Sequence, residues 1–538
     1  MILMSYLKNF KCYIKGLPKL LYVIVFLGTI VRLTGIWYGL PLALNVDEPS
    51  IVSTAFRLRH SLNPERFDWP HLYFYINAFF YGLFTITRNF LNIFFDLPDV
   101  LFTVTPFFVI SRLVTVMFGV LSILAIFYLA SIVFRNKYIS LLSALLLAIL
   151  PVHVYESHWA KLDVVQTFFV IIALVFIYNV YLNAKRKDFI LAGVFIGIST
   201  SIKYNGFLLF FVLLVAFLLH YKRDYKKWFS KYNIFNFVYA GITSIILFLI
   251  GTPYALFDHE LFLSNEYGKG VLWQFQNVGK VSFAQYPFEL YETFFEMYKT
   301  DLGFFLWIIF LLILILFLFF NKRDDKTTLF ILPVLVFSFY ISSFKRSPSH
   351  YFLFLSPMYI IIISAFIYNI GHRIRLKLLE KSISKSVVNL ILALFLFFML
   401  FPSLIITFKN DLYMSRKDTR VIAFNWVKNN LPDTKNSDFL YVMGEDLEQV
   451  PFRKNETKRI KRVDSDNLRG EGFPAYLIIG VEGVYPDELF SKKMDSDNLE
   501  GDAEQVLKHS ELELYVNDSN RFGPPIYIYK VFDVDQDK

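Results

Sequence analysis

Residues 163–183 read DVVQTFFVIIALVFIYNVYLN, an apolar run in which Asp163 is the only charged residue. About twenty such residues cross the hydrocarbon core of a bilayer as one α-helix. The run therefore predicts a membrane-spanning helix. Its carboxylate stands at the very start, where the helix dipole stabilises a negative charge. Asp163 can thus be read either as an ordinary N-cap residue or as a functional carboxylate.

Similar apolar runs, each bounded by charge, lie on both sides of this segment. Together they predict about eleven spans: 20–41, 106–134, 139–153, 163–183, 189–202, 206–221, 233–252, 302–320, 328–343, 351–370 and 387–408. Composition agrees, because 56% of the 538 residues are hydrophobic, 19% are aromatic and only 18% are charged. A soluble domain is about a quarter charged. We therefore predict a mainly α fold, a polytopic membrane helix bundle.

The charge distribution orients the predicted bundle. The net charge is +9, and basic residues cluster in short loops, which is typical of cytoplasmic loops and argues against nucleic-acid binding. With eleven spans, six clusters fall on one face: 8–19, 135–137, 185–187, 222–227, 322–326 and 373–377. This face is expected to be cytoplasmic, as is the N-terminus, whose first span we interpret as retained rather than as a cleaved signal. The composition favours a bacterial or archaeal plasma (inner) membrane.

One further segment could change the predicted number of membrane spans. Residues 71–95 (HLYFYINAFFYGLFTITRNFLNIFF) are apolar and long enough to span, and a span here would swap the side of every later loop. The segment also contains Asn77, Arg88, Asn89 and Asn92, which hydrocarbon disfavours. We interpret it as an amphipathic helix along the membrane face, with a true span as the alternative.

The chain is expected to divide into two domains. Residues 1–409 form the transmembrane domain, with extracytoplasmic loops at 42–105, which carries the juxtamembrane helices, and 253–301. Residues 410–538 have a soluble composition and predict a small extracytoplasmic α/β domain. Its expected elements are helices at 419–430 and 501–509 and strands near 439–443, 475–481, 511–516 and 526–532.

Four polar groups interrupt the apolar pattern. The first is Asp47-Glu48 after the first span, which could supply a base, metal ligands or a cation pathway, or could be an ordinary solvated loop. The second is 156–163 (ESHWAKLD), which includes His158 and Lys161.

The third group is 199–206 (STSIKYNG), in which Lys203 lies between two apolar runs and could bind phosphate or snorkel to the surface. The fourth is 344–357 (FKRSPSHYFLFLSP), where Arg346 and His350 could bind an anion or anchor the interface. The span count places all four groups on the outer face. That arrangement suits a reaction on a phosphorylated lipid, whose tail lies in the bilayer while its phosphate meets a cation at the surface.

These residues, in this order, resemble the GT-C superfamily of integral membrane glycosyltransferases. The resemblance is to the branch of protein O-mannosyltransferases and lipid A aminoarabinose transferases, and it covers roughly residues 20–430. The matching elements are Asp47-Glu48, the aromatic stretch 69–73, Arg112, Asp163, Lys203–Gly206, Arg346 with His350, Tyr351 and Pro357, and Arg420 with Trp426. The usual double proline is reduced here to Pro70-His71, a departure from the family pattern.

The resemblance implies transfer of a sugar from a polyprenyl-phosphate donor to an acceptor hydroxyl on the extracytoplasmic face, with inversion. Asp47 would be the general base, while Glu48 and Asp163 are the other candidates for that role. Lys203, Arg346 and His350 would bind the donor phosphate. The remaining substrate-binding candidates are His71, Tyr73, Arg112, His158, Lys161, Tyr204 and Tyr351. The acceptor would be a protein, a lipid or a glycan. We expect no cofactor, although some branches place a divalent metal between such carboxylates.

Two other functions fit the same residues. A polytopic transporter could use the acidic groups for ion or proton coupling, but the sequence has no inverted repeat. A non-catalytic scaffold of the same ancestry would not require Asp47, Asp163, Lys203 and Arg346 together. Consumption of a lipid-linked donor separates a transferase from both alternatives.

Overall fold

The computed structural model describes residues 18–319, 324–345, 347–431, 440–443, 457–459, 475–480, 510–516 and 521–532. This part of the chain is mainly helical and forms two compact units. The first contains the chain up to Leu33 together with Asp47–Asn410, and the second contains Thr34–Val46 together with the chain from Asp411 onward. The reading of these units as a catalytic transmembrane domain and an extracytoplasmic domain stays a prediction.

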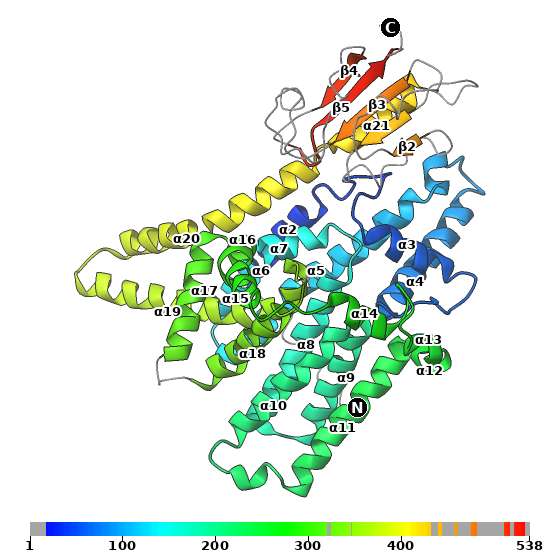
Figure 1. Cartoon of the computed structure of the whole chain (residues 1–538). Helices are drawn as coiled ribbons and strands as arrows, with labels where there is room; N and C mark the ends of the chain where they lie inside the picture. The colour runs from blue at the N-terminus through cyan, green and yellow to red at the C-terminus, as the bar shows by residue number, and fades with distance from the viewer. Residues whose placement is uncertain are drawn as a thin grey trace. The chain divides into compact units, whose positions relative to one another are not determined.

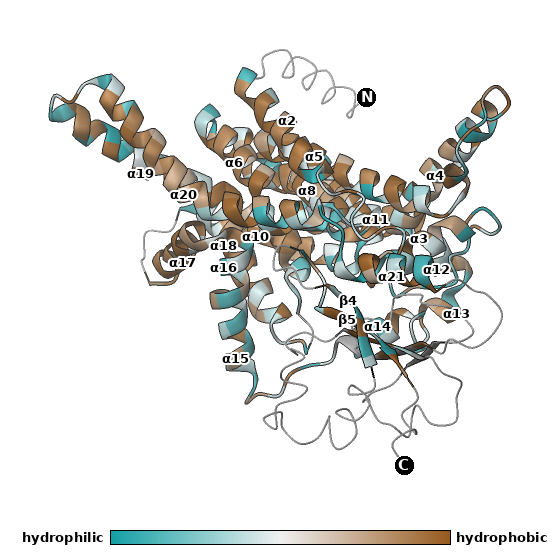
Figure 2. Cartoon of the chain, turned by 90° about the horizontal axis from the view of Figure 1, so that it is seen from above, coloured by the Kyte–Doolittle hydropathy of each residue, from teal (hydrophilic) through white to brown (hydrophobic). Residues whose placement is uncertain are grey.

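Each predicted apolar run is a helix. These helices are α2 Lys19–Leu33, α5 Thr105–Phe134, α6 Lys137–Ile149, α8 Leu162–Asn183, α9 Arg186–Ile202, α10 Leu209–His220, α11 Lys231–Gly251, α17 Phe304–Phe319, α18 Asp325–Ile341, α19 Ser356–Glu380 and α20 Lys385–Met414. Figure 2 shows that the ribbon of α5, α8 and α11 is largely hydrophobic. The first run was predicted to continue to residue 41, but α2 ends at Leu33 because Gly35 adopts the left-handed conformation with φ +76°.

Short elements fill the connections of the first unit. They are α3 Glu48–Arg57, α4 Leu72–Leu91, η1 Asp99–Phe102, α7 Pro151–Ser157, η2 Tyr204–Leu208, η3 Tyr225–Lys227, α12 Tyr254–Phe257, α13 His259–Phe262, α14 Val271–Val278, α15 Tyr286–Tyr291, η4 Glu292–Met297, α16 Tyr298–Leu302 and η5 Ser349–Leu355. Several of them carry the side chains of the candidate site, which lies where these connections meet the long helices.

Among the described residues, five helical segments are long and apolar enough to cross a membrane, or six if the bent pair α6 and α7 counts as one span. They are Thr105–Phe134, Leu162–Asn183, Lys231–Gly251, Ser349–Glu380 and Lys385–Asn430. The chain is therefore a multi-pass membrane protein, while the count of eleven spans stays a prediction. Helix α4 is not in this set. One of its faces is buried and the other exposes Phe79, Leu83 and Ile86, so its interpretation as an amphipathic helix along the membrane stays a prediction.

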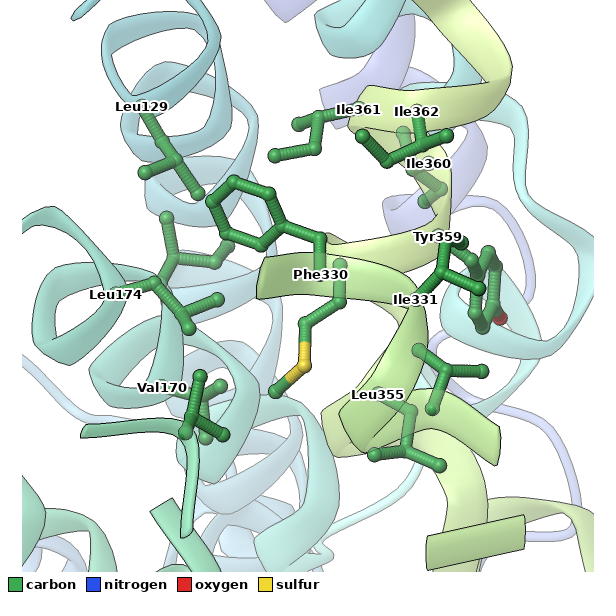
Figure 3. Packing of buried hydrophobic residues seen from close by; sticks show 14 of the residues in the cluster. Leu129, Val170, Leu174, Phe330, Ile331, Leu355, Tyr359, Ile360, Ile361 and Ile362 are labelled. Carbon is green, nitrogen blue, oxygen red and sulfur yellow. The ribbon is translucent and has the colours of Figure 1, made fainter. Parts of the chain in front are cut away.

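Helices α5, α8, α18 and α19 contribute much of the core of the first unit, part of which is seen in Figure 3. Leu129, Leu174, Phe330 and Ile361 come from these four helices and are fully buried against one another. Because lipid tails are as apolar as leucine, close van der Waals packing holds such helices together. The core thus fixes the ends of α8 and α19, which carry polar residues of the candidate site.

Helix α9 packs between α8 and α11, and the three helices run side by side in Figure 1. Its contact with α11 depends on Gly193 and Gly197, which are four residues apart. A Cβ atom at Gly193 would lie 2.8 Å from the Cα of Ala240, and one at Gly197 would lie 2.9 Å from the Cα of Ser244. Small residues at this spacing let two helix backbones approach closely within a membrane.

Helices α6 and α7 form a broken pair with a bend of 54°. Pro151 lies in the first turn of α7, which frees carbonyl groups at the end of α6. The buried guanidinium of Arg32 donates to the Leu147 and Ala148 carbonyl oxygens at 3.0 and 2.9 Å, and it also contacts His153 Nδ1 at 3.0 Å. Arg32 therefore satisfies the broken helix end and fixes the direction of α7.

The second unit contains α21 Thr419–Asn430 and a five-stranded sheet (Figure 1). The strands are β1 Leu440–Met443, β2 Thr457–Arg459, β3 Ala475–Gly480, β4 Ser510–Val516 and β5 Ile526–Val531, in the order β2-β1-β3-β5-β4. β1 is parallel to β2 and β3, whereas β5 is antiparallel to β3 and β4.

Apolar residues of α21 pack on this sheet, with Ala423 and Val427 buried against Ile478 and Ile528. The structure confirms the predicted helix at 419–430 and the four predicted strands. It adds β2, whose three residues carry no apolar side chain and gave no strand signal. The helix predicted at 501–509 lies outside the described residues.

Candidate active site

A cavity of about 360 Å³ lies where the polar connections of the first unit converge. Charged groups from distant parts of the sequence share it, namely Asp47, Lys161, Asp163 and Lys203, and the imidazole of His350 also lines it. Its remaining lining residues are Asp68, Trp69, Leu162, Tyr204, Asn205, Phe207, Leu208, Trp273, Gln274, Phe275, Tyr340, Ile341, Phe344 and Tyr351. The cavity therefore combines carboxylates, cations and aromatic walls in one place.

Asp47 and Glu48 are adjacent in sequence, but their surroundings are opposite. Asp47 is the N-cap residue of α3, lines the cavity and has 38% of its side chain exposed. Glu48, in the first turn of the helix, is fully buried. Pro49 follows at the start of α3, where its fixed φ favours the turn from loop to helix. The short helix thus directs one carboxylate to the cavity and the other into the protein.

Glu48 is held by three donors. Arg112 Nε donates to Glu48 Oε1 at 2.8 Å, Arg112 Nη2 donates to Oε2 at 2.6 Å, and the backbone N–H of Ala160 donates to Oε1 at 2.7 Å. A bidentate pair of this kind is both strong and directional. It ties α3 to α5 and to the connection before α8, so it positions Asp47 relative to Lys161.

Asp163 and Lys203 form the second charged group. Lys203 Nζ lies 2.6 Å from Asp163 Oδ1 and 4.4 Å from the centre of the Tyr351 ring. Lys203 is the C-cap residue of α9, and Gln166 Nε2 donates to its carbonyl oxygen at 3.0 Å. In this structure the ammonium therefore already has an anionic partner and an aromatic face.

Glu156 and Lys161 connect these groups. Lys161 Nζ lies 3.1 Å from Glu156 Oε2 and 3.6 Å from Asp47 Oδ2. Glu156 Oε1 in turn lies 3.9 Å from His350 Nδ1. Burial disfavours the charged form of Lys161, but Glu156, Asp163 and Asp47 outweigh it, so its pKa is raised above its usual value. Lys161 therefore remains a cation between two carboxylates.

Asp301 is a buried carboxyl close enough to Glu156 to interact with it electrostatically. Burial raises the pKa of Asp301 to about 7, the hydrogen bond from Ser349 Oγ at 2.8 Å opposes that rise, and the charge of Glu156 adds to it. Asp301 thus titrates near neutrality beside the cavity, although it does not line it.

The structure brings seven of the predicted site residues together around the cavity: Asp47, Asp163, Lys203, His350, Lys161, Tyr204 and Tyr351. Arg346 lies outside the described residues. Its proposed contact with phosphate therefore stays a prediction.

The other predicted site residues are buried away from the cavity lining. Glu48 pairs with Arg112, the Tyr73 hydroxyl contacts Thr115 at 2.8 Å, and His158 contacts backbone carbonyl oxygens. His71 Nε2 donates to the Arg66 carbonyl oxygen at 2.8 Å. Burial lowers the pKa of His71 to about 4, so it is neutral at pH 7.

Sequence reasoning did not select several residues that belong to the site. Glu156 pairs with Lys161, while Asp68, Trp273 and Gln274 line the cavity. Glu156 lay inside the polar run 156–163, so its proximity to Lys161 was a usable signal. Trp273 and Gln274 come from the 253–301 loop, and their sequence gives no sign of which residues face the cavity.

No cluster of three or more His, Cys, Asp or Glu residues suited to a metal ion occurs among the residues that the structure describes. Asp47 and Asp163 at the cavity instead have lysine partners, and Asp68 pairs with Arg66. The expectation of a metal-independent reaction remains a prediction.

The fold and the cavity define a multi-pass membrane protein with a site of paired carboxylates and lysines. Residues 81–259, about a third of the chain, match the family model of dolichyl-phosphate-mannose-protein mannosyltransferase. This match confirms the resemblance to the O-mannosyltransferase branch. The matched segment contains Arg112, Lys161, Asp163 and Lys203 of the site network. No curated protein matches the chain.

Two solved structures are similar to the chain at low identity. The apo oligosaccharyltransferase of Archaeoglobus fulgidus has 15% identity and a TM-score of 0.47, over 81% of this chain and 63% of that chain. The present chain therefore spans less than two thirds of the archaeal enzyme. ArnT from Cupriavidus metallidurans, bound to undecaprenyl phosphate, has 13% identity and a TM-score of 0.47, over 96% of this chain and 99% of that chain.

Proposed function

We propose that this protein is a glycosyltransferase that moves a sugar from a polyprenyl-phosphate donor to an acceptor hydroxyl, with inversion and with Asp47 as the general base. The observation that carries the proposal is the single cavity that holds Asp47, Lys161, Asp163, Lys203 and His350. The family match over residues 81–259 supports the glycosyltransferase class. We place the reaction on the extracytoplasmic face of a plasma membrane, with the N-terminus in the cytoplasm and the C-terminal domain outside.

Asp47 is better suited to proton abstraction than the other two carboxylates. It lines the cavity and is partly exposed, so a substrate hydroxyl can reach it. Glu48 is fully buried and accepts three hydrogen bonds, and Asp163 is paired with Lys203 at 2.6 Å. A positioned base of this kind contributes about 10²–10⁴-fold to the rate.

The proposed step is a single displacement. The acceptor oxygen forms a bond to the anomeric carbon of the sugar while its proton passes to the Asp47 carboxylate. The bond between that carbon and the phosphate oxygen breaks, and its electron pair leaves with the polyprenyl phosphate. Attack from the face opposite the leaving group inverts the anomeric carbon. The charge that develops on the phosphate requires nearby cations.

Lys203 is the principal cation for this phosphate, with His350 beside it and Arg346 as a further proposed ligand. Because Lys203 is already paired with Asp163, an incoming phosphate competes with that carboxylate for the ammonium. Donor binding would thereby release Asp163 to orient the acceptor. The cavity thus couples occupancy of the donor site to the arrangement of the acceptor site.

An apolar groove of about 470 Å³ adjoins the cavity and shares Tyr204, Phe207 and Phe275 with it. Most of its other lining residues belong to α9, α11 and the 253–301 loop, and include Ile245, Phe248 and Phe262. Such a surface suits a polyprenyl chain, since burying each methylene group in an apolar site contributes about 0.8 kcal/mol. The groove supports a lipid-linked donor in preference to a soluble nucleotide sugar.

The test uses purified protein in lipid with a panel of radiolabelled polyprenyl-phosphate hexoses and pentoses, together with protein, lipid and glycan acceptors. We expect the wild type to consume one donor and Asp47→Asn to lose at least about a hundredfold in turnover. Glu296→Gln is the matched control, because Glu296 is an exposed carboxylate that forms an ion pair with Lys299 on its own segment and does not line the cavity. The control should retain wild-type turnover.

Three other results would change the assignment. Equal donor consumption by the wild type and Asp47→Asn would keep the enzyme class but move the base to Asp163 or Glu48. Uptake of a labelled solute into sealed vesicles without donor consumption would favour the transporter. If the protein neither consumes any donor in the panel nor takes up solute, the result would favour the scaffold.

A further inference from the structure

A second large groove lies between α2, α6, α19 and α20, and no residue that lines it also lines the candidate active site. Its volume is about 370 Å³. Most of its wall is aliphatic or aromatic, with Leu145 on α6, Ile367 on α19 and Phe395 on α20. This wall suits a hydrocarbon chain.

One part of the groove is cationic and aromatic. Arg375 and His372, both on α19, line it and are exposed. The Tyr138 and Tyr368 rings stack with centroids 6.1 Å apart, and the Tyr368 and His372 rings stack at 6.0 Å. Lys137 Nζ adds a further positive charge 5.1 Å from the Tyr138 ring. The groove thus joins an apolar channel to a cluster of positive charge.

The charge at this site is not neutralised within the part of the chain that the structure describes. No carboxylate lies within ion-pair distance of Arg375 there, and neighbouring α19 residues add Arg373 and Lys377. An exposed guanidinium presents several N–H donors in a plane that matches two phosphate oxygens. Its natural counterpart is therefore an anion attached to an apolar chain.

We propose that this groove binds an anionic glycerophospholipid of the surrounding membrane, with the phosphate at Arg375 and His372 and an acyl chain along the apolar wall. Basic pockets between transmembrane helices bind anionic lipid headgroups in this way. The bound lipid would join α2, α6, α19 and α20, and would therefore stabilise this side of the bundle. The site is separate from the donor cavity and does not depend on the proposed function.

Two other occupants fit less well. Residues 1–17, which precede α2, contain Lys8, Lys11 and Lys15 and no acidic residue, so their charge has the same sign as the groove. A zwitterionic phosphatidylcholine would bring its own cation toward Arg375. Charge complementarity therefore favours a lipid with net negative charge.

The test is native mass spectrometry of the delipidated full-length protein with equimolar dioleoyl phosphatidylglycerol and dioleoyl phosphatidylcholine. We expect phosphatidylglycerol to bind at least about tenfold more tightly, and Arg375→Gln to remove about tenfold of its affinity, as for a hydrogen bond to a charged group. Arg373→Gln is the matched control, because it removes the same charge from the same helix at a residue that does not line the groove. It should leave most of the preference intact.

Gly371 provides an independent test of the apolar part. Outside its own helix turn, a Cβ atom there would have one neighbour within 4 Å among the described residues, Leu392 Cδ2 at 3.8 Å, so Gly371→Ala should fold and bind lipid normally. Gly371→Leu would extend into the groove and should reduce bound phosphatidylglycerol at least about fivefold. If Gly371→Leu fails to fold, the comparison between Arg375→Gln and Arg373→Gln decides.

Several outcomes would overturn the proposal. Equal binding of the two lipids, or equal losses in Arg375→Gln and Arg373→Gln, would mean that no specific headgroup site exists. Stronger lipid binding after removal of residues 1–17 would make that segment the occupant. Displacement of phosphatidylglycerol by stoichiometric undecaprenyl phosphate would make the groove a second site for polyprenyl phosphate.

Discussion

The carboxylate of Glu48 and the guanidinium of Arg112 form a bidentate pair in which both side chains are fully buried. The next residue toward the N-terminus, Asp47, lies at the cavity surface. Two adjacent acidic residues therefore have different tasks in our proposal, since one fixes the loop and the other reacts. Substitutions that separate these tasks test the assignment.

Arg112→Met should destabilise the protein severely, because it leaves the Glu48 charge buried without its partner. Breaking a buried ion pair in this way costs about 3–5 kcal/mol. The double variant Arg112→Met/Glu48→Leu should recover much of that loss, and Asp47→Asn should unfold like the wild type. Thermal unfolding in detergent measures all three. Equal stability of Arg112→Met and the wild type would contradict this role for the pair.

Lys203→Met should weaken the binding of polyprenyl phosphate by about tenfold to a hundredfold, as expected for a lost hydrogen bond to a charged group. Asp163→Asn should have the opposite effect, since it removes a negative charge that competes for Lys203. Quenching of tryptophan fluorescence can follow binding, because Trp69 and Trp273 line the cavity.

In Lys203→Met, the Asp163 carboxylate loses its partner and could repel the phosphate by itself. The double variant Lys203→Met/Asp163→Asn removes that charge and is the control for this effect. It should bind as weakly as Lys203→Met alone. Weaker binding in Asp163→Asn than in the wild type would rule out competition between Asp163 and the phosphate.

Gly197→Leu should separate α9 from α11 and lower the unfolding midpoint, because even a Cβ atom there would lie 2.9 Å from the Cα of Ser244. We expect a cost of at least about 1–3 kcal/mol, the range for an overpacked contact. Gly82→Ala in α4 is the control, since among the described residues its added Cβ meets no other part of the chain within 4 Å beyond its own helix turn. That variant should be as stable as the wild type or slightly more stable.

Asp301 should give the protein a pH-dependent stability between about pH 4 and 7. Its pKa is about 7 in the folded protein against 3.8 for the ordinary group, so within this window the folded state retains a proton that the unfolded state has lost. Stability then falls as pH rises, by up to about 1.4 kcal/mol per pH unit from this group. Asp301→Asn should remove this contribution.

Unfolding midpoints of the wild type and Asp301→Asn across pH 4–8 provide the measurement. As pH rises from about 4 to 7, the unfolding midpoint of the wild type should fall relative to that of Asp301→Asn. Above about pH 7 the difference between the two midpoints should be constant. A difference that is constant throughout would mean that Asp301 is ionised in the folded state.

The helices were predictable because a membrane-spanning helix satisfies its own backbone hydrogen bonds. It therefore appears in the sequence as a long run of apolar residues. Apolar length alone predicted a helix at residues 163–183, and the structure has α8 at Leu162–Asn183. The strands of the second unit were predictable from alternating and apolar runs such as 526–532. β2 was missed, because Thr457–Arg459 forms a strand through its pairing with β1 rather than through its own side chains.

The candidate site was predictable only in part. Asp163 and Lys203 stood out because a charge next to an apolar run is costly, and the structure pairs them. The burial of Glu48 could not be predicted, since it depends on Arg112 and the Ala160 backbone. The positions of Trp273 and Gln274 likewise depend on how a long connection folds back toward η2 and η5. Local sequence identifies charged residues but does not decide which of them meet.

The contact of Arg32 with the end of α6 constrains how this chain can evolve. One side chain on α2 satisfies carbonyl groups of Leu147 and Ala148, contacts His153, and so holds the bend that leads to Glu156. A substitution at position 32 would leave those carbonyl groups without their donor and would also loosen the bend between α6 and α7. Relatives that lack the arginine should therefore carry compensating changes near positions 150–153, so that these positions vary as a linked set through the lineage.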